Sequence, residues 1–597
     1  MRRAGCAFAI ASAVLIGLAP PPARAAELKA VVAGNLDRSL RKEIEDAIGQ
    51  SKSRPESGVE ARRRARDAAS DAISLLRSEG YYDGSVEPNV SEGDPPRAIV
   101  NITPGVRFHF RDATVEWVGP APPSGAAKAG EEAVRLASGA PGRAADVLAA
   151  EGRVVAALQK LGFADAEIRP RKVVVDYADR SVKPTFNIAA GDLIRLDGVK
   201  VITKGRTRAG WVRGLAPWKH GDRYSPEAVA KLERRLTDAA VYDSVTVSLA
   251  PKAQSVGDER PVLVSLSDRP RRTIELGAGY STSEGSGVDG KYFIYNRLGR
   301  ADTVTLTAIL YDIQQKLDLE LALPDWRRPD QTLRIGGGLL ADRTAAYDDA
   351  GGGVRLDVDR HFTKTTFITL GGALDYAATR EKTAINLLAT PVGVDLKLFI
   401  TTGLAAFALD RSNDPLNPTR GWRLEARVEP TSIVGDRNLV YLKTQTQASA
   451  YLPLDSSAAT VIAGRLKLGS ILGGSIPDVP ADRRFYAGGG GSVRGYGYQA
   501  VGPRLIDNTP EGGLSLLESS LELRQRLSRQ WGGVAFVDAG AVGSGSTPDF
   551  RNVSVGVGVG VRYDLGFGPL RLDVATPLNP RQGDGRVQVY ISIGQAF

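Results

Sequence analysis

The chain has 597 residues and a formal charge of +9 at pH 7. It is therefore too long for one ordinary domain and only mildly basic, which gives no reason to expect nucleic-acid binding. The arginine run at residues 62–66 is expected to be a solvated helix face. Cys6 is the only cysteine, so the rest of the chain has neither a disulfide nor a thiolate metal site.

The first 25 residues have the pattern of a signal peptide. Arg2 and Arg3 precede an apolar run that ends near Ala19, and Ala23-Arg24-Ala25 follows as a cleavage site. We therefore expect export of a chain that starts near residue 26. No later stretch approaches about 18 consecutive apolar residues, so any insertion into a membrane would use a β-barrel.

A repeated pattern divides the first half of the chain. An amphipathic helix end, a small residue, one or two aromatic or apolar residues and an aspartate recur at 80–83, 162–165 and 240–243. The pattern predicts three α+β modules at 26–105, 106–190 and 191–270, each with a strand, two helices and two or three strands. Ala240 stands where the other two modules have glycine. An open sheet edge in such a module could take an extended partner strand, or the modules could be spacers.

From about Arg272 to the end, segments of about ten residues alternate between apolar and polar side chains. Roughly 325 residues at about 20 per strand and connection predict about 16 strands of an antiparallel transmembrane β-barrel over 271–597. A soluble β-sandwich or β-propeller is the alternative for such a pattern. The alternation continues through Gly594 to Phe597, which favours a last strand that runs to the chain end.

One glycine-rich stretch interrupts the strands of the second half. Residues 488–491 are four glycines, and Ser492-Val493-Arg494-Gly495-Tyr496 follow at once. A backbone this free suits a loop that folds back closely on something else. Aromatic residues at 485, 486, 496 and 498 favour a packed loop over a solvated one.

Four segments together resemble the bacterial outer-membrane β-barrel assembly and translocation superfamily. They are the AGGGGSVRGY stretch, the Asp-rich turn at 410–422, the segment Phe536-Val537-Asp538-Ala539-Gly540 and the terminal phenylalanine. This resemblance implies periplasmic POTRA domains followed by a 16-stranded barrel in the outer membrane. Three modules are most similar to the TamA subfamily, the outer-membrane subunit of a translocation and assembly module.

The resemblance also implies a latch inside the barrel. In this family the loop arginine, here Arg494, reaches the lumen and meets the aspartate at Asp538, and Glu522 lies where a second acidic partner would be. Gly495 and Tyr496 complete the latch motif, and Phe536 and Gly540 flank the aspartate as a supporting motif. An arginine offers several fixed donors, so we expect Arg494 to hold the loop to the wall.

The implied function is the insertion or secretion of β-rich clients such as autotransporters. Its partners would be unfolded outer-membrane protein clients, the lipid bilayer and an inner-membrane-anchored, periplasm-spanning partner of the TamB type. The first strand (273–282) and the last (586–597) would form a weak seam where clients enter. Gly277, Gly279 and Gly594 would shorten its hydrogen-bonded ladder, and Phe597 would be the C-terminal signal.

The sequence predicts no enzymatic activity. Its three histidines are far apart without an H-E-x-x-H motif, and there is no G-x-S-x-G nucleophile elbow. No catalytic residue, cofactor or metal site is expected. A passive outer-membrane channel or receptor, and a lipid-transport subunit of an envelope-bridging complex, remain alternative functions.

Overall fold

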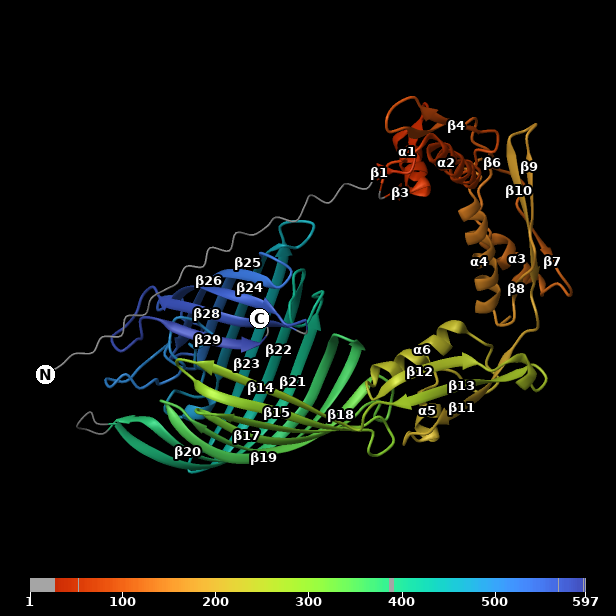
Figure 1. Cartoon of the computed structure of the whole chain (residues 1–597). Coiled ribbons are helices and arrows are strands. Elements are labelled where there is room, and N and C mark those ends of the chain that lie inside the picture. The colour runs from red at the N-terminus through yellow and green to blue at the C-terminus, as the bar shows by residue number, and fades with distance from the viewer. Residues whose placement is uncertain (1–26, 52, 386–390, 567, 594, 596–597) are drawn as a thin grey trace. The chain divides into compact units, whose positions relative to one another are not determined.

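The computed structural model describes residues 27–51, 53–385, 391–566, 568–593 and 595. In the described residues, four small sheets with helices precede one closed barrel (Figure 1). The chain divides into two compact units. The first contains the residues up to Asp197 together with 220–227 and 252–260, and the second contains the remainder, including the barrel. The predicted signal peptide lies outside the described residues.

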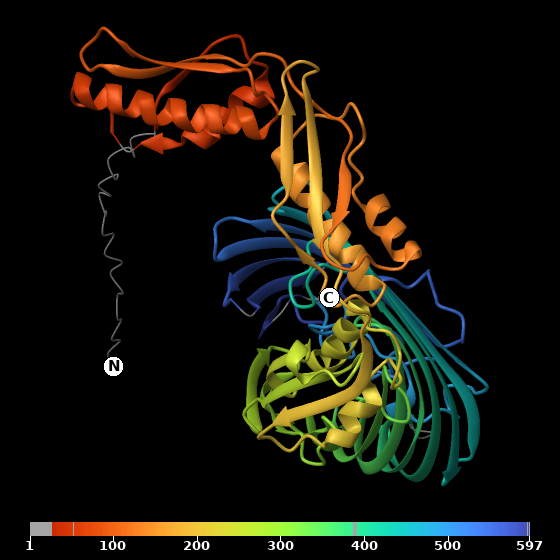
Figure 2. The ribbon, with the colours of Figure 1, turned by 90° about the vertical axis from the view of Figure 1, so that its right-hand side faces the viewer.

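The first module packs two helices on a small sheet. Its elements are β1 (Glu27–Leu28), β2 (Val31–Ala33), α1 (Arg38–Ile48), β3 (Gln50–Ser51), α2 (Gly58–Ser78), β4 (Ser85–Ser91) and β5 (Arg97–Thr103). Ser57 caps α2 by accepting a hydrogen bond from the backbone N–H of Glu60. Along α2, Ala65, Ala72 and Leu76 are buried at helical spacing. Figure 2 shows this long helix running along the sheet.

The second module is built around one central strand. Its elements are β6 (His109–Phe110), β7 (Thr114–Trp117), α3 (Ser124–Ala133), α4 (Ala144–Lys160), β8 (Glu167–Ile168), β9 (Lys172–Asp176) and β10 (Ser181–Ala189). β10 pairs in parallel with β6 and β7 and antiparallel with β8 and β9. Val154 and Leu158 of α4 are fully buried, as are Phe186 and Ile188 of β10, and they form the core between helix and sheet.

The third module has the sheet order β11-β13-β12. Its elements are β11 (Arg195–Thr203), α5 (Ala209–Leu215), α6 (Pro226–Asp238), β12 (Tyr242–Leu249) and β13 (Glu259–Asp268). Proline opens α6, where its missing N–H costs nothing. Val229, Leu232 and Leu236 are buried on one face of α6, as their spacing predicts.

The repeated small residue of the three modules has a conformational cause. Gly80, Gly162 and Ala240 follow the last helix of their modules with φ of 93°, 104° and 57°. Such positive φ values suit glycine and strain any residue with a Cβ. The repeated aspartate also has a role in the second module, where Asp165 accepts hydrogen bonds of 2.8 and 2.7 Å from the Arg260 guanidinium. This contact holds the pKa of Asp165 below its usual range.

Replacing Ala240 with glycine is expected to stabilise the third module by about 1 kcal/mol, because it removes the strain of a left-handed alanine. Hydrogen exchange of residues 241–249 should slow in this variant. The matched control is Ala239→Gly at the preceding residue, which does not have a positive φ and should gain nothing. Exchange that is equally fast or faster in Ala240→Gly would contradict the strain argument.

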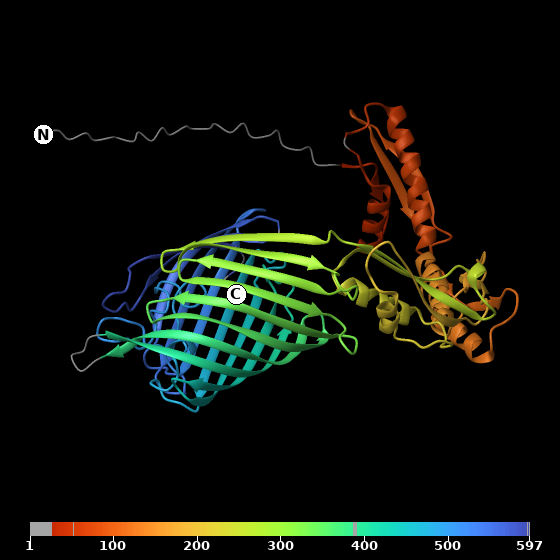
Figure 3. The same cartoon turned by 90° about the horizontal axis from the view of Figure 1, so that it is seen from below.

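The barrel has the 16 antiparallel strands that the alternation predicts. They are β14 (Arg272–Ser281), β15 (Gly285–Tyr295), β16 (Thr303–Tyr311), β17 (Gln314–Leu323), β18 (Gln331–Arg343), β19 (Tyr347–Thr363), β20 (Thr366–Ile385), β21 (Pro391–Asp410), β22 (Gly421–Gly435), β23 (Leu439–Pro453), β24 (Thr460–Leu472), β25 (Ser515–Arg526), β26 (Trp531–Gly543), β27 (Ser554–Asp564), β28 (Pro569–Pro577) and β29 (Gln588–Ile593). Figure 3 shows the side from yellow-green β14 to teal β20.

Apolar side chains cover the outside of the barrel. Leu276, Leu339 and Phe399 are 83%, 65% and 65% exposed, whereas their neighbours along the strands face the interior. Strand length is where the ten-residue prediction is wrong, since β20 and β21 have 20 residues each. The residues of β21 that precede Leu398 pair with β20 alone, because the pairing of β21 with β22 begins at Leu398. No helix of the described residues is long and apolar enough to cross a membrane.

Turns at the rim where β14 begins contact the part of the third module that belongs to the same unit. Asn296, between β15 and β16, donates a hydrogen bond of 2.9 Å to the Thr207 hydroxyl. Lys364, between β19 and β20, forms an ion pair of 2.6 Å with Asp238 of α6. These contacts identify the module-side rim of the barrel. The loop between β24 and β25 starts from the opposite rim.

Candidate functional site

The loop between β24 and β25 (residues 473–514) folds into the barrel and packs there. Phe485, Val493 and Tyr496 of the loop are 4%, 0% and 1% exposed. They belong to one apolar cluster with wall residues such as Ile433 and Val542. The aromatic residues of the glycine-rich stretch therefore make a packed loop, as the sequence predicts.

Arg494 lies at the centre of the contact between loop and wall and is 1% exposed. Its Nε and Nη2 donate to the two carboxylate oxygens of Asp538 at 2.6 and 2.9 Å, and its backbone N–H donates to the same carboxylate at 3.0 Å. The guanidinium carbon lies 3.4 Å from the ring centroid of Phe536. The structure thus brings Arg494, Asp538 and Phe536 together by a bidentate ion pair and a stacked ring.

Two further carboxylates contact the same guanidinium. Glu522 and Asp573 approach Arg494 Nη1 at 2.8 and 3.0 Å, and both are fully buried. Glu522 is the second acidic partner that the family resemblance implies, whereas the sequence reasoning missed Asp573. The sequence pattern that could have identified Asp573 is the run from Leu570 to Val574. In this run Arg571 and Asp573 alternate with apolar residues and must therefore face the barrel interior.

Three more arginines balance these carboxylates. Arg524 pairs with Glu522 at 2.8 Å, and Arg571 pairs with Asp573 at 2.6 Å. Arg562 also binds Asp573. We call the whole set the latch cluster: Arg494, Arg524, Arg562, Arg571, Glu522, Asp538 and Asp573. The network has four cations and three anions, and each of the three carboxylates has a cationic partner. Loss of one member would leave another charge buried without its partner, which strongly destabilises a fold.

Glycines on the wall make room for the loop. A Cβ built on Gly556 would lie 1.9 Å from the backbone oxygen of Arg494, and one on Gly540 would lie 2.5 Å from Val493. Gly495, with φ of 98°, lies against the backbone of Thr576. Gly556 of β27 and the glycine of the supporting motif thus permit the loop to approach the strands closely.

Tyr496 fixes the loop one residue beyond Gly495. Its hydroxyl makes a hydrogen bond of 2.6 Å with the Asn579 side chain, in the connection between β28 and β29. The three latch residues predicted from the sequence, Arg494, Gly495 and Tyr496, therefore all contact the wall, from β25 to the connection that leads to the last strand.

The barrel closes through a short ladder between its first and last strands, which we call the seam. β14 and β29 share two register pairs, Tyr280 with Ile591 and Ser281 with Tyr590. The adjoining ladders are longer, since β14 and β15 share ten pairs and β28 and β29 share six. Thr282 adds a backbone bond of 3.1 Å to the Val589 carbonyl oxygen. The seam is thus the weakest strand pairing of the described barrel.

Neither of the two predicted gate glycines on β14 belongs to this ladder in the described residues. Gly277 and Gly279 precede the paired residues on β14, and a Cβ on each would meet Asp289 and Tyr311 on the inner face. Both glycines make room for these neighbouring side chains. The pairing of β14 with β29 begins only at Tyr280, after both of them. Gly594 and Phe597 lie outside the described residues.

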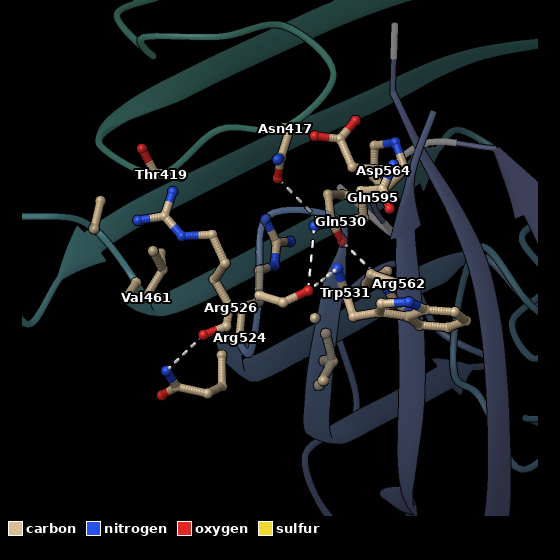
Figure 4. Close-up of a pocket in the computed structure, with 18 of the residues that line it drawn as sticks. Asn417, Thr419, Val461, Arg524, Arg526, Gln530, Trp531, Arg562, Asp564 and Gln595 are labelled. Carbon is tan, nitrogen blue, oxygen red and sulfur yellow. Dashed lines mark hydrogen bonds between the residues drawn. The ribbon is translucent and has the colours of Figure 1, made fainter. Parts of the chain in front are cut away.

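Gln595 joins the chain's last part to the module-side rim. Figure 4 shows its side chain between Asn417 and Arg562. It donates to the Asn417 side-chain oxygen at 3.1 Å and accepts from Arg562 Nε at 3.0 Å. Asn417 lies in the Asp-rich turn, which connects β21 and β22 and thus also holds this last part of the chain. Arg562 connects the same part to the rest of the latch cluster.

One group of metal-binding residue types occurs among the described residues. His220 lies between Asp197 and Glu259, with its two ring nitrogens 3.4 Å from one carboxylate each. Both nitrogens donate in this arrangement when the ring is protonated, whereas a metal needs a free nitrogen lone pair. All three side chains are also substantially exposed. We assign no metal to this group.

Comparison with known proteins places this geometry in a family. The model of the Omp85 superfamily domain matches residues 296–597, which contain most of the barrel, the loop and the latch cluster. This chain belongs to the Omp85 superfamily. Among solved structures, BamA from Haemophilus ducreyi lacking POTRA domains 1–3 has a similar fold, with a TM-score of 0.67 and 19% identity, covering 81% of this chain and 100% of that one.

Curated Omp85 relatives are distant in sequence. The outer membrane protein assembly factor BamA of Neisseria meningitidis serogroup B is 21% identical over 88% of this chain and 72% of its own length. BamA of Nitratidesulfovibrio vulgaris is 24% identical over 73% of this chain, which spans 55% of that protein. The chain is an outer-membrane β-barrel with α/β POTRA modules in the periplasm. The module-side rim is therefore periplasmic.

Proposed function

We propose that this Omp85 protein inserts or secretes β-rich clients such as autotransporters, in the manner of the TamA subfamily. Unfolded outer-membrane proteins would reach the seam from the periplasm, and the POTRA modules would dock an inner-membrane-anchored partner of the TamB type. We also propose that the process uses no catalytic residue, cofactor or nucleic acid, since folding of the client supplies the free energy.

The observation that carries this proposal is the two-pair ladder between β14 and β29. When this ladder parts, both strands present unpaired N–H and C=O groups, which are a template for another β-strand. The other described ladders of the barrel are too long to part at similar cost. The seam is thus the place where a client strand could add to the barrel wall.

A disulfide across the seam tests the proposal. Glu275, near the start of the first strand, is a wrong position for a cysteine, because the described ladder with β29 contains only Tyr280 and Ser281 of β14. Tyr280 and Ile591 are direct partners, so cysteines there are within disulfide reach in a mature chain without other cysteines. Oxidation of Tyr280→Cys/Ile591→Cys should abolish client assembly, and a reductant should restore it.

The matched control locks a ladder that need not open. Cysteines at Ala278 and Val288 are direct partners between β14 and β15, and their disulfide should leave client assembly unchanged. If the locked seam assembles clients as the parent does, the insertion proposal falls and a passive channel or receptor takes its place. Lipid transfer that stops while client assembly continues would instead favour the lipid-transport subunit.

A further inference from the structure

The apex of the inward loop lies directly behind the seam and contacts both of its sides. On the first side, Gly490 donates its backbone N–H to the Glu284 carboxylate at 3.1 Å. Glu284 belongs to the turn that follows β14. On the second side, the Tyr590 hydroxyl of β29 accepts from the Gly495 N–H and donates to the Tyr496 carbonyl oxygen, each at 3.2 Å.

The four-glycine run fits this position. A Cβ on Gly489 would lie 2.7 Å from the Glu284 carboxylate, and one on Gly490 would lie 2.8 Å from the Tyr590 ring. A Cβ on Gly491 would have nothing within 4 Å. Gly489 and Gly490 are therefore needed for close approach to the two sides of the seam, whereas Gly491 is free of such a constraint.

The contacts at the apex are comparable in number with those of the seam itself. The seam has two register pairs and the bonds of Thr282, one of which is its hydroxyl donating to Gln588 at 2.6 Å. The apex adds one bond to the first side and two to the second, and Tyr590 is only 3% exposed. Hydrogen bonds to a carboxylate are among the stronger ones in proteins.

A cavity of about 520 Å³ adjoins these contacts on the lumen side. Its lining includes Tyr280 and Glu284 from the first side of the seam, Ile591 and Tyr590 from the second, and Gly490 from the loop. The described side chains of the wall do not fill the space behind the seam. The direct contacts across the seam on this side therefore come from the loop apex.

We propose that residues 489–496 form a clasp that holds the seam closed, with Glu284 and Tyr590 as its positioning residues on the two sides. The latch cluster anchors the loop to the wall from β25 to β28, and the clasp extends that anchorage across the seam to the first hairpin. Seam opening then requires release of Gly490 from Glu284. The clasp deepens the proposed function, because it concerns the control of the same seam.

Hydrogen exchange in the full-length protein in membranes tests the clasp. When Glu284→Ala removes the carboxylate, the amides of Thr282 and Val589 should exchange about tenfold faster, since their exchange requires the seam to open. Amides of the β18–β19 ladder should be unchanged. Gly490→Ala should have the same effect through its clash with Tyr590, and Gly491→Ala is the matched control that should exchange like the parent.

The clasp would be overturned if the seam amides of both Glu284→Ala and Gly490→Ala exchanged at the parent's rate. It would also be overturned if the seam amides of Gly491→Ala exchanged as fast as those of Gly490→Ala. If Glu284→Ala speeds exchange throughout the barrel, its effect is not specific to the seam, and Glu284→Gln is then the variant that tests the clasp. That variant keeps the size of the side chain and a neutral acceptor. Its seam amides must then exchange several-fold faster than the parent's, or the clasp is rejected.

The clasp and the insertion proposal can fail separately. Faster seam exchange in Glu284→Ala, together with normal client assembly by the disulfide-locked seam, would support the clasp and reject lateral insertion. Loss of assembly on locking, together with unchanged exchange in the clasp variants, would support insertion and reject the clasp.

Discussion

The Arg494→Lys variant is expected to have a barrel less stable than the parent's by about 2–3 kcal/mol, and Arg494→Ala by about 3–5 kcal/mol. Lysine keeps the charge, but its single ammonium cannot bond both oxygens of Asp538 while also reaching Glu522 and Asp573. Each carboxylate that loses its partner stays buried. The temperature at which the folded barrel loses its faster electrophoretic mobility should fall in the same order.

Arg529→Lys is the control for this pair of variants, because Arg529 is exposed in the turn between β25 and β26. Its heat-modifiability should match the parent's. If Arg494→Lys has the heat-modifiability and the client assembly of the parent, the latch cluster has no role in holding the barrel.

The second large effect is expected from a change that leaves every charge in place. In Gly556→Ala the new methyl group would lie 1.9 Å from the Arg494 carbonyl oxygen, far inside van der Waals contact. Both atoms are fixed to backbones, so the loop or β27 must move, and the bonds between Arg494 and Asp538 must lengthen. We expect a loss of about 3 kcal/mol of barrel stability.

Protease access to residues 473–514 and heat-modifiability measure this effect. Gly464→Ala is the matched control, also a strand glycine of the barrel, where the nearest atom to the new methyl group would be a backbone oxygen at 4.0 Å. The control should behave as the parent does. An equally protected loop in Gly556→Ala would show that the loop does not approach β27 as closely as the structure has it.

Local patterns were enough to predict the architecture. Alternation with a period of two predicts barrel strands, because each strand has one face toward lipid and one toward the lumen. Likewise the spacing of Val229, Leu232 and Leu236 predicts the buried face of α6. Residues such as Arg494 and Asp538 were found through their motifs, since the family resemblance names both partners.

The partners that no motif names needed the tertiary structure. Asp573 and Glu284 lie 79 and 206 positions from the loop residues that they contact. Such contacts depend on how far each strand is displaced along its neighbour, summed around the closed barrel, and a period-two pattern is unchanged when a strand shifts by two residues. The sequence by itself therefore determined the modules, the strands and the latch motif. Only barrel closure decided the pairing of Tyr280 with Ile591, the third carboxylate at Arg494 and the position of the loop apex behind the seam.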